Sequence, residues 1–91
     1  MKEELTFDAV RDVFTNYLNQ KKHRKTPERF AILKQIFDNE GHFDAESLYN
    51  QMQNDYRVSL ATVYNTMELL LDCGLIVKHP FAGQTSQFEK T

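Results

Sequence analysis

The apolar residues of this chain recur at three- and four-residue steps over four separate stretches, a spacing that buries one face of an α-helix. The first stretch begins after Thr6 and reaches about Leu18. Its predicted apolar stripe consists of Phe7, Val10, Val13, Phe14, Tyr17 and Leu18. In the later stretches the inward-facing residues are expected to be Phe30, Leu33, Ile36 and Phe37, then Leu48, Tyr49 and Met52, and finally Leu60, Val63, Met67, Leu70 and Leu71.

Each stretch begins with a side chain that can accept hydrogen bonds from the free amides of a helix N-terminus. The predicted N-caps are Thr6, Thr26, Asp44 and Ser59. Pro27 occupies the first helical position after Thr26, where its missing N–H costs nothing. The last helix is expected from about Leu60 to Cys73, with Gly74 as the residue that follows its end.

After Gly74 the pattern changes from helical to extended. Residues 75–79 are rich in branched side chains, 80–84 supply a turn, and 85–89 read as a returning strand. A two-stranded ribbon alone is marginally stable, so it is expected to pack on the helices. The predicted fold is therefore mainly α with a small β hairpin: a winged helix-turn-helix with an extra helix in front.

Length and composition fit one small globular domain of 91 residues, with 41% hydrophobic and 26% charged residues. No apolar run approaches a membrane span, and the N-terminus lacks the features of a signal peptide. The single cysteine, Cys73, cannot form an internal disulfide, so a reducing cytoplasmic location is expected. No motif of a catalytic site is present, and the chain is not expected to be an enzyme.

The net charge of −2 does not by itself favour nucleic acid, but the charges are unevenly distributed. Residues 21–25 read Lys-Lys-His-Arg-Lys, with Arg29 just beyond. Such a run is often only a solvated face. Here it stands immediately before a helix N-terminus, whose amides also attract phosphate, so Arg24, Lys25 and Arg29 are candidate DNA contacts.

The start of the last helix has the side chains expected of a tip that enters the major groove of DNA. Small residues such as Ala61 let the backbone come close, and Thr62 can touch a thymine methyl group. Tyr64 can stack or bond a phosphate, while Asn65 can contact adenine through two hydrogen bonds. We therefore predict that Ser59, Ala61, Thr62, Tyr64 and Asn65 form a DNA-binding face. The alternatives are a half-buried aromatic role for Tyr64 and a solvated role for Asn65.

Two passages resemble the ferric uptake regulator family of bacterial repressors. The first is Arg-Lys-Thr-Pro-Glu-Arg at 24–29, continued by Gly-His-Phe-Asp-Ala-Glu-Ser-Leu-Tyr at 41–49. The second is Val-Ser-Leu-Ala-Thr-Val-Tyr at 58–64, continued by Cys-Gly-Leu-Ile at 73–76. The resemblance implies a winged-helix domain that binds a palindromic operator in double-stranded DNA. It also implies a homodimer formed through a second domain, so residues 1–91 are expected to be a fragment without that domain.

The resemblance further implies a regulatory metal site that takes Fe(II), Mn(II) or Zn(II). Matched to the family, His42 and Glu89 are the candidate ligands, with a histidine bonded to local backbone and a solvated charge as the alternatives. His79 is a third candidate that is not taken from this match, and it falls on the first wing strand. Two ligands hold such an ion weakly, and His42 and Glu89 are expected on separate parts of the domain. This chain alone is therefore expected to bind metal weakly or not at all.

The subfamily stays open, because the residue clues conflict. Asn65 is typical of the peroxide-sensing branch, whereas a glutamate at position 89 is typical of the iron type. Iron, peroxide or zinc response all remain compatible with the sequence. The alternative of another class is a winged-helix protein-interaction module that does not touch DNA, which the acidic net charge favours.

Overall fold

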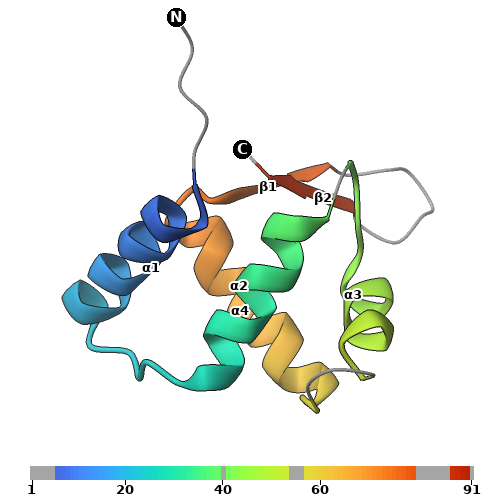
Figure 1. Cartoon of the computed structure of the whole chain (residues 1–91), viewed down its shortest axis with the longest axis horizontal. Coiled ribbons are helices and arrows are strands. Elements are labelled where there is room, and N and C mark those ends of the chain that lie inside the picture. The colour runs from blue at the N-terminus through green and yellow to red at the C-terminus, as the bar shows by residue number, and fades with distance from the viewer. Residues whose placement is uncertain (1–5, 40, 54–56, 80–86, 91) are drawn as a thin grey trace, which may run out of the picture.

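The fold consists of four helices followed by an antiparallel ribbon, in the order that the sequence predicts. A computed structural model describes residues 6–39, 41–53, 57–79 and 87–90. The elements are α1 (Phe7–Lys21), α2 (Pro27–Asp38), α3 (Ala45–Met52), α4 (Leu60–Asp72), β1 (Ile76–His79) and β2 (Gln87–Lys90). Helices α2 and α4 run through the middle, α1 and α3 flank them, and the ribbon closes one edge (Figure 1). The predicted winged helix with an extra N-terminal helix is confirmed.

All four predicted N-caps accept the expected backbone hydrogen bond. The bonds run from the amides of Ala9, Arg29, Ser47 and Thr62 to the side-chain oxygens of Thr6, Thr26, Asp44 and Ser59, at 3.2, 3.4, 2.7 and 3.1 Å. The end of α4 lies one residue earlier than predicted, with Cys73 as its C-cap. Gly74 follows at φ +82°, a left-handed conformation that L side chains rarely adopt. Local sequence therefore determines where each helix begins and where α4 ends.

The core fills the space between α2, α4 and the elements that flank them. Its most buried side chains are Phe14, Leu18, Ile32, Leu33, Ile36, Leu48, Val63, Met67, Leu70 and Ile76. The predicted place of Val13 in the buried stripe is wrong, because its side chain is 45% exposed. The buried row of α1 is the narrower set Val10, Phe14 and Leu18, spaced by four residues. Leu60 and Leu71 are half-buried rather than buried.

The ribbon is held to the helices by a backbone pairing with the segment before α3. In β1 and β2, Ile76 pairs with Lys90 and His79 pairs with Gln87. Phe43 forms an isolated antiparallel bridge with Phe88, with N–O distances of 2.9 and 2.7 Å in the two directions. The predicted strands are confirmed over the described residues, while the predicted turn at 80–84 and the start of the returning strand lie outside them.

One polar contact joins the first helix to the fourth across the surface. The Tyr17 hydroxyl donates to Asp72 Oδ2 over 2.7 Å. This hydrogen bond, together with desolvation and the charge of Asp72, raises the pKa of Tyr17 from 10.0 to about 12. The neutral phenol is therefore the form that stabilises the fold. The stabilisation is complete below pH 10 and is lost as the pH rises to about 12.

We expect Tyr17→Phe to lower the free energy of unfolding at neutral pH and to make its decline between pH 10 and about 12 shallower. The reason is that phenylalanine can neither donate to Asp72 nor ionise. Urea unfolding across this pH range measures both effects, with Tyr64→Phe as a control that removes an exposed hydroxyl elsewhere. An identical alkaline decline in Tyr17→Phe and the unsubstituted chain would contradict the role assigned to this bond.

Candidate nucleic-acid interface and metal centre

The N-terminal ends of α2 and α4 lie together at the edge of the molecule opposite the ribbon (Figure 1). Between them is an open depression of about 460 Å³. It is lined by Arg24, Thr26, Glu28, Arg29, Ala61, Thr62 and Asn65. Five of the eight predicted DNA-binding residues therefore share one surface, although they come from two segments far apart in the sequence. Glu28 is the one carboxylate among the lining residues.

The other three predicted residues lie beside this depression in different ways. Tyr64 is 47% exposed, which fits a half-buried aromatic of α4 as well as a DNA contact. The Ser59 hydroxyl caps α4 and also lies 2.8 Å from the Thr62 hydroxyl. Lys25 is exposed, and its ammonium group donates to the side-chain carbonyl of Asn19 on α1. Ser59 is thus engaged in forming the helix tip, whereas Tyr64 presents its ring to solvent.

The first turn of α4 is held in place by both apolar packing and hydrogen bonds. Val58 and Val63, which stand on either side of the Ser59 cap at the spacing of a hydrophobic staple, are 8% and 0% exposed. Gln53 donates from its side-chain amide to the Val58 carbonyl over 3.1 Å, which joins the end of α3 to the start of α4. The polar face of α4 is therefore presented by a helix end that packing and capping both hold in place.

A guanidinium group connects the segment before α2 to α4. Arg29 donates from Nη1 to the Arg24 carbonyl and from Nη2 to Asn65 Oδ1, the latter over 3.2 Å. The sequence nominates all three residues separately as DNA contacts but does not reveal that they touch one another. No local signal indicates such a contact, since it depends on how α2 and α4 pack.

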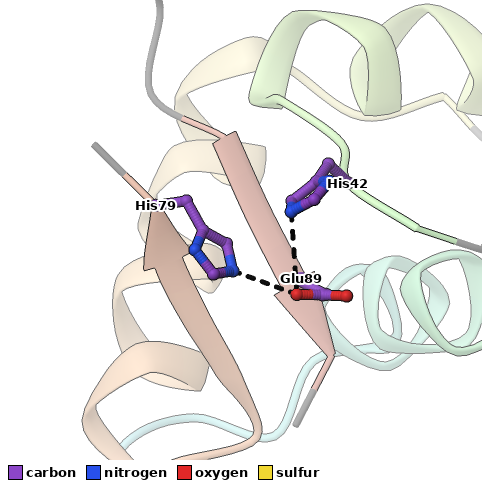
Figure 2. Close-up of side chains that lie close together, drawn as sticks. All are labelled: His42, His79 and Glu89. Atoms are coloured by element: carbon purple, nitrogen blue, oxygen red, sulfur yellow. Dashed lines mark hydrogen bonds and ion pairs between the residues drawn. The ribbon is translucent and has the colours of Figure 1, made fainter. Parts of the chain in front are cut away.

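A second cluster lies on the ribbon and contains two histidines and a glutamate. The carboxylate of Glu89 lies 3.0 Å from His79 Nε2 and 3.7 Å from His42 Nε2. The two imidazole rings meet edge to face with centroids 4.8 Å apart. Figure 2 shows the three side chains converging from the loop before α3, from β1 and from β2. The side chains are 39–48% exposed, so an ion can reach them from solvent.

The strand register explains why these three residues meet. Glu89 pairs with Val77, which places it diagonally opposite His79 on one face of the ribbon. Its neighbour Phe88 points to the other face, into the core, and binds the backbone of Phe43. His42, one residue before Phe43, is thereby brought to Glu89. The expectation that His42 and Glu89 lie on separate parts of the domain is wrong, because this bridge joins them.

The donor set of the cluster suits a divalent transition metal. Its ligand atoms, two imidazole nitrogens and a carboxylate oxygen, lie within 4.8 Å of one another, and such ligands match Fe(II), Mn(II) or Zn(II). Three ligands leave coordination positions open for water or for other groups. Within the described residues this is the only group of three or more His, Cys, Asp or Glu side chains with this geometry. Cys73 lies outside it, and burial raises the pKa of its thiol.

Comparison with known proteins identifies the family. Residues 20–91 match the family described as "Ferric uptake regulator family". The chain belongs to the ferric uptake regulator family. The members of this family are metal-responsive, DNA-binding transcriptional regulators rather than enzymes. No helix of the described residues is long and apolar enough to cross a membrane.

Ferric uptake regulators and peroxide-responsive repressors are both among the relatives. The chain is 37% identical over 67 residues to the ferric uptake regulation protein of Rhizobium leguminosarum bv. viciae, covering 72% of this chain and 47% of that protein. It is 33% identical over 67 residues to the peroxide-responsive repressor PerR of Staphylococcus saprophyticus, covering 72% of this chain and 45% of the repressor. The chain thus spans about half the length of the curated relatives that it matches.

A solved structure confirms the same fold. The ferric uptake regulator from Pseudomonas aeruginosa, determined with manganese, superposes with a TM-score of 0.71 at 31% identity. The match covers 86% of this chain and 60% of that protein. Family membership therefore rests on both sequence and structure.

Replacing Ser59 tests whether its N-cap hydrogen bond stabilises the start of α4. We expect Ser59→Ala to lower the free energy of unfolding by about 0.5–2 kcal/mol, because the Thr62 amide loses its acceptor. Ser59→Asp should keep most of that stability, since aspartate is an equally good N-cap. Urea unfolding of the two variants measures the difference. Equal stability of Ser59→Ala and the unsubstituted chain would show that the hydrogen bond does not hold the tip.

Proposed function

We propose that this chain is the DNA-binding part of a metal-responsive transcriptional repressor, with the N-terminal half of α4 in the major groove. The observation that carries the proposal is the depression between α2 and α4, where basic residues and the polar tip of α4 form one surface. Arg24 and Lys25 contact phosphates beside the groove, and the α2 N-terminus adds its amide groups. Membership of a family of DNA-binding regulators supports this proposal.

Each residue of the α4 tip has a distinct role in this proposal. Ala61 and Thr62 allow a close approach of the backbone and contact a thymine methyl group. Tyr64 lies against the sugar-phosphate backbone or a base, and its exposed ring is free to do so. Asn65 reads one base edge through its amide. Ser59 shapes the tip through its cap, and Arg29 lies between the two segments.

We further propose that His42, His79 and Glu89 bind the regulatory metal ion. The solved relative with manganese supports a divalent transition metal. His79 adds a third ligand to the two that family motifs suggest, so this chain should hold an ion without help from another domain. A bound ion would be a Lewis acid that neutralises Glu89 and ties the ribbon to the loop before α3. Iron, peroxide-linked and zinc responses share this donor chemistry.

For the full-length regulator we propose a homodimer on a palindromic operator. The relatives are about twice as long as the region that this chain matches, which leaves room for a dimerisation domain in proteins of this kind. A two-fold dimer would present two α4 tips to two half-sites related by the same symmetry. Each half-site would then be read by a surface such as the one between α2 and α4.

A selection from randomised duplex DNA followed by binding measurements tests the DNA-binding proposal. We expect Asn65→Ala to weaken binding to the selected sequence by about 1–3 kcal/mol and to relax the preference at one base pair. Replacing Arg24 and Lys25 by alanine is the matched contrast. That variant should weaken binding to all sequences and reduce the salt slope by about one unit for each phosphate that the protein no longer neutralises. A chain without affinity for any duplex, even at low salt, would support the protein-interaction alternative instead.

Competition with a chromophoric chelator tests the metal site. We expect the chain to bind Zn(II) or Mn(II), and His79→Ala, His42→Ala or Glu89→Ala each to lower the affinity by more than the roughly 10–100-fold that an outer-shell partner contributes. His23→Ala is the matched control, because it removes the one histidine outside the cluster. If His79→Ala bound metal as tightly as the unsubstituted chain, the third ligand would be ruled out.

A further inference from the structure

The contact between Arg29 and Asn65 has a consequence for which bases α4 can read. We propose that Arg29 is a positioning residue that fixes the orientation of the Asn65 amide and thereby makes Asn65 a hydrogen-bond donor to DNA. The proposal rests on the DNA-binding function proposed above. It assigns to Arg29 a role in specificity that a simple phosphate contact would not have.

Hydrogen bonds fix the backbone of Arg29, and its side chain extends from α2 to α4. It lies in the first turn of α2, where its amide bonds both the Thr26 side chain and the Thr26 carbonyl, at 3.4 and 3.2 Å. Pro27 fixes the backbone of the same turn. The guanidinium then bonds the Arg24 carbonyl on one side and Asn65 Oδ1 on the other. A side chain bonded at both ends of its fork has lost most of its rotational freedom.

The chemistry of the guanidinium decides which way the amide of Asn65 faces. Arginine carries five N–H donors and no acceptor, so only the oxygen of the amide can face it. The Nδ2 atom of Asn65 is then directed away from Arg29 with its two N–H donors. A flipped amide would set N–H groups against N–H groups and leave both without a partner. Arg29 therefore selects one of the two amide orientations.

The selected orientation changes the expected base preference. An unconstrained asparagine reads adenine by accepting from N6 and donating to N7. Here one lone pair of Oδ1 is already occupied by Arg29, whereas both N–H donors remain available. The edge that best satisfies two donors is that of guanine, which offers O6 and N7 as acceptors. The structure thus favours guanine over the adenine that the sequence alone suggests.

Arg29→Lys separates positioning from charge. Lysine keeps the positive charge but has a single ammonium group, which cannot bond the Arg24 carbonyl and Asn65 as a planar fork does. In a selection from randomised duplexes we expect the unsubstituted chain to prefer guanine at one position. Arg29→Lys should lower that preference at least about 5-fold while leaving the salt slope unchanged. Arg24→Lys is the matched control, because Arg24 contributes only its backbone carbonyl to the contact.

Asn65→Asp is a second variant, which keeps the hydrogen bond with Arg29 and removes the N–H donors of Asn65. Its carboxylate still accepts from Arg29 but carries no donor, so the preference for guanine should be lost and an edge with a donor, such as that of cytosine, should be favoured. The preference is measured as a ratio between duplexes, which removes the general loss caused by the added negative charge. Retention of the guanine preference in either Arg29→Lys or Asn65→Asp would overturn the proposal.

The contact itself can be measured without DNA. In ¹H–¹⁵N spectra of the free chain, the side-chain amide signals of Asn65 should shift in Arg29→Lys and stay in place in Arg24→Lys. An unshifted Asn65 signal in Arg29→Lys would overturn the positioning role. If the signal shifts but the unsubstituted chain binds no duplex, the proposed DNA-binding function fails. If the chain binds duplex DNA without preferring guanine, the assignment of Asn65 as a base-reading donor alone fails.

Discussion

The backbone pairing of Phe43 with Phe88 is the contact on which the rest of the structure depends. A two-stranded ribbon is marginally stable alone, and β1 and β2 have four residues each. The bridge adds a partner to β2 and brings two phenylalanine rings, 4% and 8% exposed, into the core. Lys90 strengthens the same attachment by donating to the Phe37 carbonyl near the end of α2 over 2.8 Å. The ribbon is thus fixed to the helices.

This attachment also creates the metal-ligand cluster and links it to the helix proposed to read DNA. His42 and Glu89 are the sequence neighbours of the two bridged phenylalanines, so the bridge brings them within 3.7 Å of each other. His79 ends β1, and β1 follows α4 after residues 73–75. A bound ion would therefore connect the loop before α3 to a strand that continues from α4. The candidate nucleic-acid face lies at the other end of α4 (Figure 1).

The sequence predicts the elements of this fold well because their signals are local. A cap such as Ser59, a proline such as Pro27 or a glycine such as Gly74 acts within one helical turn, and all three occupy the predicted positions.

Contacts between side chains of different elements are harder to predict from the sequence. Val13 is exposed because the way α1 packs on α2 decides the width of its buried row, which periodicity alone does not show. The place of His79 beside Glu89 follows from strand register, which is fixed only when β1 and β2 pair. The contact of Arg29 with Asn65 likewise follows from the packing of α2 against α4, since these residues are 36 positions apart. Tertiary packing therefore decides which of the nominated residues lie together.

The most direct test of the account is to map the duplex-binding surface by the backbone amide shifts of the chain in ¹H–¹⁵N spectra during titration with double-stranded DNA. We expect the largest changes on residues 22–29 and 59–65, the two segments that meet between α2 and α4. Residues 42, 79 and 89 should change little in that titration and respond instead to added Zn(II). Large DNA-induced changes confined to α1 or to the ribbon, with the start of α4 unaffected, would contradict it.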